Sequence, residues 1–282
     1  MSTSKEINIR KASGELVPYD PEKVRESLER AHVSDSIIGD IINQVNNTVS
    51  DGMDSHELYN WIYQLLDEYD TPTAARYNLK NAIMQLGPTG YPFEKFLSQI
   101  LIRLGYTTTV GEIVQGRCIK HEVDVLATKD STHYMIEAKY HNQPGSKTDV
   151  QAALYTYARF TDIREKWESD PSEGHEVHQG WLITNTKLTS DAIEYAECVG
   201  LQISSWDYPL GASLRRLITE GSFHPITAIK NMNQKQRDLL FTLDKVLCLD
   251  ILDMTPEDVM KYDLEKAFQE AKAIVDNNGS VK

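Results

Sequence analysis

The chain has 282 residues, enough for one large domain or for two ordinary domains that each have a core. Its 40% hydrophobic and 25% charged residues are ordinary for a globular protein, and no run reaches the roughly 20 apolar residues of a membrane span. The formal net charge of -13 counts against a protein that coats nucleic acid non-specifically, but it is compatible with a metal site built from carboxylates.

The cysteines and the N-terminal residues indicate the compartment. Cys118, Cys198 and Cys248 are scattered and odd in number, which gives no disulfide framework and fits a reducing environment. The N-terminal residues contain no apolar segment of the kind found in secretory signals. We therefore expect a cytoplasmic protein without a membrane partner.

The first part of the chain predicts a small domain of one strand and several helices. Residues 5–10 alternate in polarity, as in a short strand, and Asp20 and Pro21 then begin a helix as N-cap and first helical residue. Three further helical segments follow: 37–49, a segment capped by Ser55, and 73–86. The Gly/Pro-rich sequence 86–92 stops the last of them, so we assign residues 1–88 to this domain.

The central part predicts an α/β sandwich with a mixed sheet. An amphipathic helix is expected over residues 93–104. It is followed by strands at 106–114, 121–128 and 133–141, a helix at 148–167, a strand at 180–184, a helix at 190–199 and a strand at 201–204. This order favours helices packed on a mixed sheet, which we assign to residues 89–221. Residues 222–282 are predicted to be helical, and packing on this fold, binding a partner and contacting DNA remain alternatives for them.

One predicted hairpin carries residues suited to phosphodiester chemistry. Asp124 lies on its first strand, and Glu137 and Lys139 lie two positions apart on its second strand, so these two share a face. Pairing across the hairpin can bring Asp124 beside Glu137, and two carboxylates suit a hard cation such as Mg²⁺ or Mn²⁺. A lysine beside the cation can position or deprotonate water, or stabilise developing charge. The alternative is an exposed ion-pair ladder without a catalytic role.

The Asp…Glu-x-Lys spacing of this hairpin resembles the PD-(D/E)xK nuclease superfamily, and its surroundings resemble the Mrr-like restriction endonuclease branch. Residues 93–106 resemble the first helix of that branch, and 151–155 resemble its QxxxY element. Residues 180–196 resemble its next strand and helix, so the resemblance covers about residues 91–208. The proline of the superfamily name is replaced by Val123.

The resemblance implies an Mg²⁺-dependent endonuclease that acts on DNA in a restriction or defence-like role. It implies Asp124 and Glu137 as metal ligands, Glu94 as an assisting ligand, and Lys139 and Gln151 as further catalytic residues. Glu94 has an alternative role as an acidic residue favoured in the first turn of a helix, and Gln151 as an ordinary surface residue. The acidic balance of the chain keeps a second class of function open, a non-catalytic module that holds nucleic acid or senses a nucleotide.

Residues 5–31 resemble the ATP-cone, a small regulatory nucleotide-binding domain. The matching residues are Lys11, Gly14, Tyr19, Asp20 and Lys23. The resemblance implies ATP or dATP as a regulatory ligand, with Lys11 and Lys23 at the phosphates and the neighbouring Arg10 as a further cation on the opposite face of the strand. The family has two successive basic residues where this chain has Lys11 and Ala12, so a degenerate module that makes only protein contacts is the alternative.

We expect binding of ATP or dATP at residues 5–86 to change the oligomeric state and, through it, the nuclease activity. The linker is short, so a movement of the first domain would shift Glu94. A homo-oligomer with one site per subunit suits a nuclease that must meet both strands of a duplex. DNA, a nucleoside triphosphate and a second copy of the chain are the expected partners.

Overall fold

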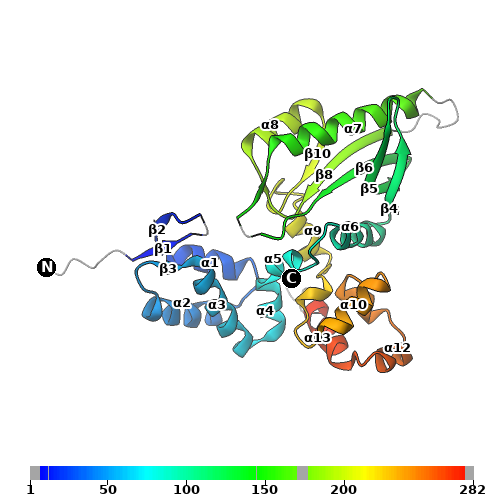
Figure 1. Ribbon diagram of the computed structural model, residues 1–282. Coiled ribbons are helices and arrows are strands. Elements are labelled where there is room, and N and C mark those ends of the chain that lie inside the picture. Colours follow the sequence, from blue (N-terminus) through cyan, green and yellow to red (C-terminus); the bar gives the residue numbers. More distant parts are fainter. Residues whose placement is uncertain (1–6, 12, 144, 170–176, 277–282) are drawn as a thin grey trace. The chain divides into compact units, whose positions relative to one another are not determined.

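The computed structural model describes residues 7–11, 13–143, 145–169 and 177–276. Contacts divide the chain into two compact units, and the division falls between Asn81 and Ala82. Figure 1 labels the helices and strands along the chain. No helix in the described part of the chain is long and apolar enough to cross a membrane.

The first unit joins a small sheet to a group of helices. Its elements are β1 (Asn8–Arg10), β2 (Leu16–Pro18), α1 (Pro21–Glu29), α2 (Asp35–Thr48), β3 (Met53–Asp54), α3 (Ser55–Tyr69) and α4 (Thr71–Tyr77). The sheet has the order β2-β1-β3, with β2 antiparallel and β3 parallel to β1. Asp20 caps α1 by accepting from the Glu22 N–H at 3.0 Å, as expected. The cap of α3 is Asp54 and not Ser55, because the Asp54 side chain accepts from His56 N–H.

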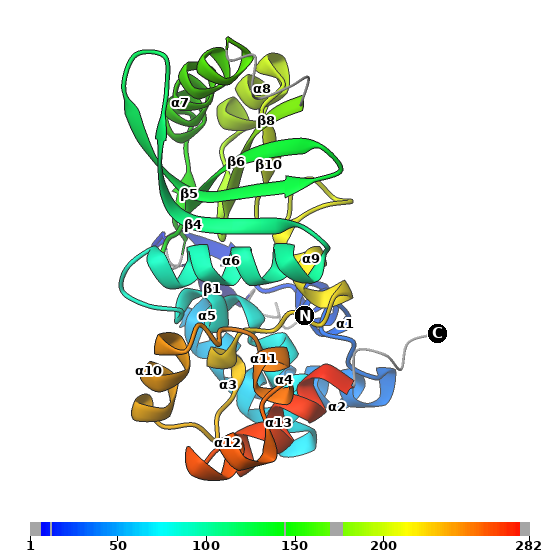
Figure 2. The same cartoon turned by 90° about the vertical axis from the view of Figure 1, so that its right-hand side faces the viewer.

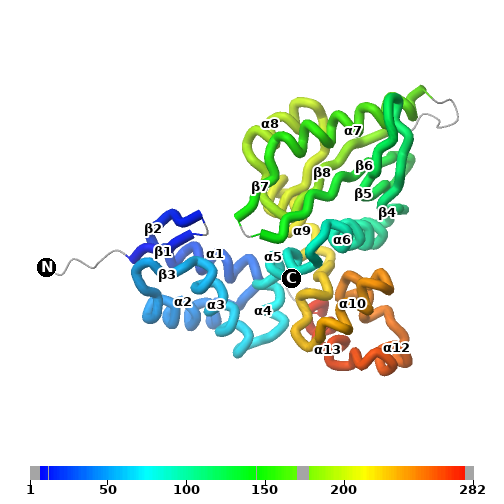
Figure 3. The backbone as a smooth tube through the Cα atoms, viewed as in Figure 1, coloured from blue at the N-terminus to red at the C-terminus, as the bar shows by residue number. Residues whose placement is uncertain are grey.

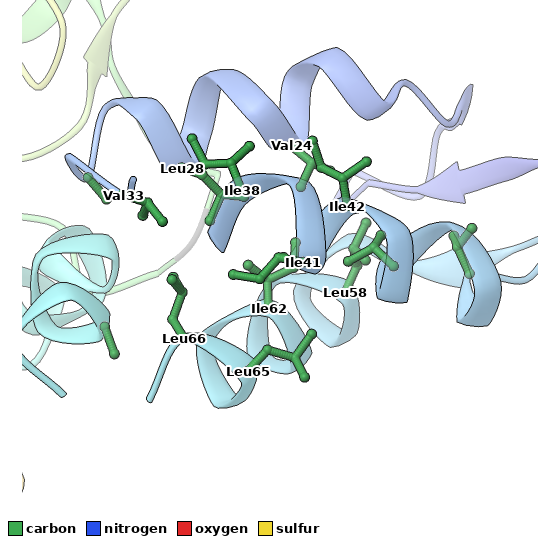
Figure 4. Packing of buried hydrophobic residues seen from close by; sticks show 14 of the residues in the cluster. Val24, Leu28, Val33, Ile38, Ile41, Ile42, Leu58, Ile62, Leu65 and Leu66 are labelled. Atoms are coloured by element: carbon green, nitrogen blue, oxygen red, sulfur yellow. The ribbon is translucent and has the colours of Figure 1, made fainter. Parts of the chain in front are cut away.

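The core of the first unit is aliphatic and lies between α1, α2 and α3 (Figure 4). Leu28 of α1 packs with Ile38 and Ile41 of α2 and with Ile62 and Leu66 of α3, and each of these side chains is buried. The spacing of three or four residues within each helix places these side chains on one face. The helices therefore hold each other, and the short strands of the sheet are left at one edge of the unit.

The second unit is built on a mixed sheet of five strands. Its elements up to the end of the sheet are α6 (Tyr91–Arg103), β4 (Thr107–Gln115), β5 (Lys120–Lys129), β6 (Thr132–Lys139), β7 (Lys147–Thr148), α7 (Val150–Glu168), β8 (Val177–Thr184), β9 (Lys187–Leu188), α8 (Ser190–Val199) and β10 (Gln202–Ser204). The strand order is β10-β8-β6-β5-β4, antiparallel from β4 to β6 and parallel from β6 to β10. The predicted α/β fold with a mixed sheet is confirmed.

Helices cover both faces of this sheet: Figure 2 shows α6 on one face and α7 and α8 on the other. On the α6 face, the rings of Phe93 and Tyr140 lie 5.5 Å apart. On the other face, Phe160 of α7 packs with Met135 of β6. A Cβ at Gly180 would come within 2.8 Å of Phe160 Cγ, so the glycine lets α7 lie close to β8.

The C-terminal helices belong to the second unit. They are α9 (Leu214–Glu220), the 3-10 helix η1 (Ile226–Ala228), α10 (Gln234–Thr242), α11 (Cys248–Leu252), α12 (Pro256–Lys261) and α13 (Glu265–Asp276). Arg103 at the end of α6 donates to Asp250 at 2.9 Å and to Asp253 at 2.6 Å. Of the alternatives that the sequence leaves open for this segment, the structure therefore shows packing against the helix that precedes the sheet.

The sequence predicts one helix over 73–86, but the structure has two shorter helices there, α4 and α5 (Leu79–Met84). The division between the units falls inside α5. Thr227 Oγ1 donates to Ala82 O at 2.6 Å, and Tyr140 OH donates to Met84 O at 2.6 Å. These bonds hold the end of α5 to the second unit. The domain bounds 1–88, 89–221 and 222–282 remain predictions.

Candidate active site

Asp124 lies where strands β5 and β6 separate. The two strands pair from Lys129–Thr132 to Val125–Ile136, and the next pair in this register would be Asp124–Glu137. That pair is absent from the described register, and the Ala138 N–H instead donates to Asp124 Oδ2 at 2.7 Å. The hairpin therefore brings Asp124 beside the second strand, as the sequence predicts, but through its side chain.

A glycine with an unusual backbone conformation lies on the other side of β5 at the level of this separation. Gly111 of β4 is the residue opposite Asp124, and it has φ +71, which residues with a Cβ seldom adopt. Beyond this point the β4–β5 hairpin curves toward α7 (Figure 2). Asp162 of α7 holds the curved part, accepting from Cys118 N–H at 2.8 Å and contacting His121 Nε2 at 2.7 Å. Asp124 thus lies at the bend of the β4–β5 hairpin.

Three carboxylates lie close enough to affect each other's charge. Burial, and then the charge of Asp124, raise the pKa of Glu137 to about 7, although Arg159 opposes the rise. Burial, and then the charges of Asp124, Glu122 and Glu137, raise the pKa of Glu94 to about 7. Burial also raises the pKa of Asp124, although the hydrogen bond from the Ala138 N–H lowers it in part. The predicted residues Asp124, Glu137 and Glu94 therefore form one acidic group, in which each charge is costly without a cation.

Arg159 of α7 is part of this site and is not predicted from the sequence. Its guanidinium forms an ion pair with Glu137 Oε2, and the side chains of Arg159 and Glu137 are only 10% and 16% exposed. The guanidinium also lies over the Tyr155 ring, 5.1 Å from its centroid. A sequence signal was present: Arg159 follows Tyr155 and Gln151 at successive intervals of four, the spacing of one helix face.

Lys139 and Gln151 lie at two ends of this arrangement. Lys139 ends β6, is exposed, and lowers the pKa values of both Asp124 and Glu137 by its charge. Gln151 is exposed in the first turn of α7, where its backbone N–H donates to the capping residue Asp149 at 3.1 Å. The structure therefore brings Lys139 to the carboxylates and places Gln151 on the helix that supplies Arg159.

A buried polar network fixes the chain beyond Lys139. Asn185 accepts from His141 N–H at 2.8 Å and donates to His141 O at 2.7 Å. His141 Nε2 contacts Thr148 Oγ1 at 3.0 Å, and Thr148 Oγ1 contacts Thr184 Oγ1 at 2.9 Å. Burial, and then the charge of Lys139, lower the pKa of His141. Since Thr184 is the register partner of Lys139, this network restrains the end of β6 from the β8 side.

The donor chemistry of the site fits a hard divalent cation. Asp124, Glu137 and Glu94 offer carboxylate oxygens, the ligands that Mg²⁺ and Mn²⁺ prefer, and each raised pKa reports a charge that a cation would stabilise. Among the residues described, no group of three His, Cys, Asp or Glu side chains is already arranged around a metal position. Arg159 supplies the positive charge next to Glu137.

The first unit contains a cavity of about 260 Å³ between its sheet and its helices. Lys11 and Lys23 are among its lining residues and Arg10 is not, so two of the three predicted nucleotide-binding residues border it. Tyr59 and Tyr77 also line it, with their rings stacked 4.9 Å apart at 17°. The cavity therefore offers an aromatic wall and two cations.

Residues 87–210 match a family model described as "Restriction endonuclease", and residues 7–80 match one described as "ATP cone domain". An uncharacterized protein of Archaeoglobus fulgidus is 33% identical over 184 residues, which are 64% of this chain and 99% of that protein. A crystal structure of a protein of unknown function is 32% identical with a TM-score of 0.55, and the match covers 67% of this chain and 100% of that one.

Proposed function

Because the chain belongs to the restriction endonuclease family and carries an ATP cone domain ahead of its nuclease domain, we propose that it is an Mg²⁺-dependent endonuclease that hydrolyses DNA under nucleotide control. The observation that carries the proposal is the acidic group of Asp124, Glu137 and Glu94 at the point where β5 and β6 separate. Burial raises the pKa of all three carboxyls, and the charge of Asp124 raises the pKa of Glu137 and of Glu94 further. Such a group beside a lysine suits a cation and a phosphate better than it suits an ion-pair ladder.

Each side chain has a role that follows from its place. A divalent cation supplies Lewis-acid stabilisation of phosphate charge when bound, and Asp124, Glu137 and Glu94 would hold it. Lys139, exposed beside these carboxylates, orients the attacking water or neutralises developing charge. Arg159 holds the Glu137 carboxylate from the side of α7.

Plasmid cleavage in Mg²⁺ tests the site. Asp124→Ala and Lys139→Ala should each lower the cleavage rate by about 100-fold or more, the usual size of a lost charge or proton-transfer group. Lys272→Ala, which removes an exposed lysine of α13, is the matched control and should keep the rate. Cleavage that persists unchanged in both site variants would contradict the assignment.

The Arg159–Glu137 ion pair favours a second candidate function, a non-catalytic module, because it neutralises a carboxylate of the site without a metal. Calorimetric titration with Mn²⁺ distinguishes the two functions. An endonuclease should bind Mn²⁺, and Glu137→Gln should weaken that binding. An absence of Mn²⁺ binding at millimolar concentration would favour the non-catalytic module.

Nucleotide control is proposed from the cavity of the first unit. Lys11 and Lys23 would contact the phosphates, and the stacked pair Tyr59 and Tyr77 would border the rest of the nucleotide. ATP or dATP should then change the size of a homo-oligomer, measured by light scattering, and the cleavage rate. Lys23→Ala should remove both responses. If neither the oligomer size nor the cleavage rate of the wild-type chain changes when nucleotide is added, the proposed nucleotide regulation is contradicted.

A further inference from the structure

Two lysines lie side by side in a small parallel pair of strands next to the candidate site. In this pair, β7 with β9, Lys147 is the register partner of Lys187 and Thr148 is that of Leu188. Thr148 and Leu188 are buried, whereas both lysines are exposed. Figure 3 labels β7 on the stretch of chain that leads into α7. The two lysine side chains therefore project from the same face of this short pair of strands.

The register that buries Thr148 and Leu188 also places two like charges opposite each other. Like charges directly opposite each other in a sheet are destabilising. The chain holds 42 acidic residues against 29 basic ones, yet among the described residues no carboxylate pairs with Lys147. Lys187 forms an ion pair with Asp207 at 3.8 Å, and Arg215 pairs with the same carboxylate at 3.1 Å. Lys147 is thus left without a neutralising carboxylate among the described residues, and Lys187 shares its carboxylate with Arg215.

Hydrogen bonds connect this lysine pair to the end of β6. Thr148 follows Lys147, and its Oγ1 contacts Thr184 Oγ1 at 2.9 Å and Thr186 Oγ1 at 3.1 Å. Thr184 is the register partner of Lys139, the lysine assigned to the site. Because the linking threonines are buried, the backbones of Lys147 and Lys187 are restrained relative to the backbone of Lys139.

The helices that follow these strands add partial positive charge at the same edge. α7 begins immediately after β7 and its cap Asp149, and α8 begins after β9 and its cap Thr189. Thr189 N–H donates to Thr148 O at 3.0 Å, so the two helix starts are neighbours. Asp149 follows β7 in the chain, and its side chain already accepts from the Gln151 and Ala152 N–H groups, whereas Asp191 lies in the first turn of α8.

We propose that Lys147 and Lys187, the lysine pair, bind the phosphate backbone of duplex DNA and lead it into the site at Lys139. Charge complementarity selects this partner: two exposed cations in register, of which Lys147 has no carboxylate partner among the described residues and Lys187 shares Asp207 with Arg215, suit a regular polyanion. The pair also answers how such an acidic protein holds DNA, because it provides a local basic surface beside the acidic group. This inference rests on the proposed function, since it takes the substrate to be DNA.

The test measures duplex binding by fluorescence anisotropy in Mg²⁺, with the full chain carrying Asp124→Ala as the parent so that the duplex stays intact. In this parent, Lys147→Gln with Lys187→Gln should weaken binding about tenfold or more. The slope of log Kd against log salt should fall by about 1.8, the counterion release of two phosphate contacts. The matched control, Lys266→Gln with Lys272→Gln on α13, makes the same charge change at exposed positions and should keep both values.

Three results would overturn the inference. One is a lysine-pair variant that binds like the control. Another is a lysine-pair variant that loses binding to polyglutamate but keeps binding to the duplex, which would assign the pair to an acidic protein. The third is a parent that does not bind duplex DNA. Plasmid cleavage by the wild-type chain decides separately whether the proposed function also fails, so the two failures are distinguishable.

Discussion

Replacing Glu94 by glutamine should stabilise the metal-free protein at alkaline pH and have no effect at acidic pH. Burial and the charges of Asp124, Glu122 and Glu137 raise the pKa of Glu94 to about 7, so the folded state resists ionisation of this carboxyl. Between the pKa of an unfolded glutamate, about 4.3, and about 7, the folded protein binds more protons at this position than the unfolded chain does. Stability of the wild type therefore falls as pH rises through this window, and glutamine removes the fall.

The size of the effect follows from the pKa. A rise from 4.5 to about 7 corresponds to about 3 kcal/mol, at 1.36 kcal/mol for each tenfold change in proton affinity. Glu94 is only partly buried, and solvent screening reduces this figure to about 1–2 kcal/mol. We therefore expect Glu94→Gln to raise the free energy of unfolding by about 1–2 kcal/mol at pH 8 and to leave it unchanged near pH 4.5.

The assay is urea unfolding in EDTA, followed by tryptophan fluorescence. Trp167, Trp181 and Trp206 lie in the second unit, so the signal reports mainly on the unit that contains Glu94. Glu257→Gln is the matched control, because Glu257 also lies in the first turn of a helix, α12, and is exposed. Equal effects of the two variants at pH 8 would assign the change to the helix dipole and would refute the reasoning. In Mn²⁺, Glu94→Gln should instead lower the free energy of unfolding, since it then removes a metal ligand.

Two further predictions concern the support around the site. Gly180→Ala should destabilise the second unit by about 1–3 kcal/mol in the same assay, because its Cβ would meet Phe160 Cγ at 2.8 Å, whereas Gly211→Ala, with no atom within 4 Å, should be near neutral. Asp162→Asn should lower the melting temperature at pH 7, because the His121 contact and the backbone N–H bonds lower the pKa of Asp162 to about 2. The stabilisation by ionised Asp162 is present above the unfolded pKa of about 3.9 and is lost as pH falls toward 2. The melting temperatures of the wild type and Asp162→Asn should therefore converge at low pH. A difference in melting temperature that stays constant with pH would contradict this prediction.

The sequence was sufficient for the parts of the fold that local patterns determine. The N-cap at Asp20, the order of the main helices and strands, and the hairpin with Asp124, Glu137 and Lys139 all follow from spacing within short segments, whereas the short strands β2, β3, β7 and β9 were not predicted. Each depends on side chains a few residues apart, whose relation is set by the period of a helix or a strand. The division inside α5 could not be predicted in this way, because it depends on bonds to residues as distant as Thr227.

Two features of the candidate site required the three-dimensional structure. Arg159 continues a helix face that the sequence displays, but only packing of α7 on β6 shows that this face reaches Glu137. Gly111 inside a predicted strand is a sign of a bend, yet its position opposite Asp124 depends on the register between β4 and β5. In both cases the partner lies in another element, so spacing within one segment carries no information about it.

The bend at Gly111 also has a consequence for the solubility of the protein. β4 is the outermost strand of the sheet, and an outermost strand presents unpaired backbone groups to which another chain can add. A straight strand over Thr107–Gln115 would be a long template for such addition, whereas a bend at Gly111 divides it into two short ones. The glycine opposite Asp124 therefore limits edge-to-edge aggregation, which keeps the folded chain soluble at high concentration.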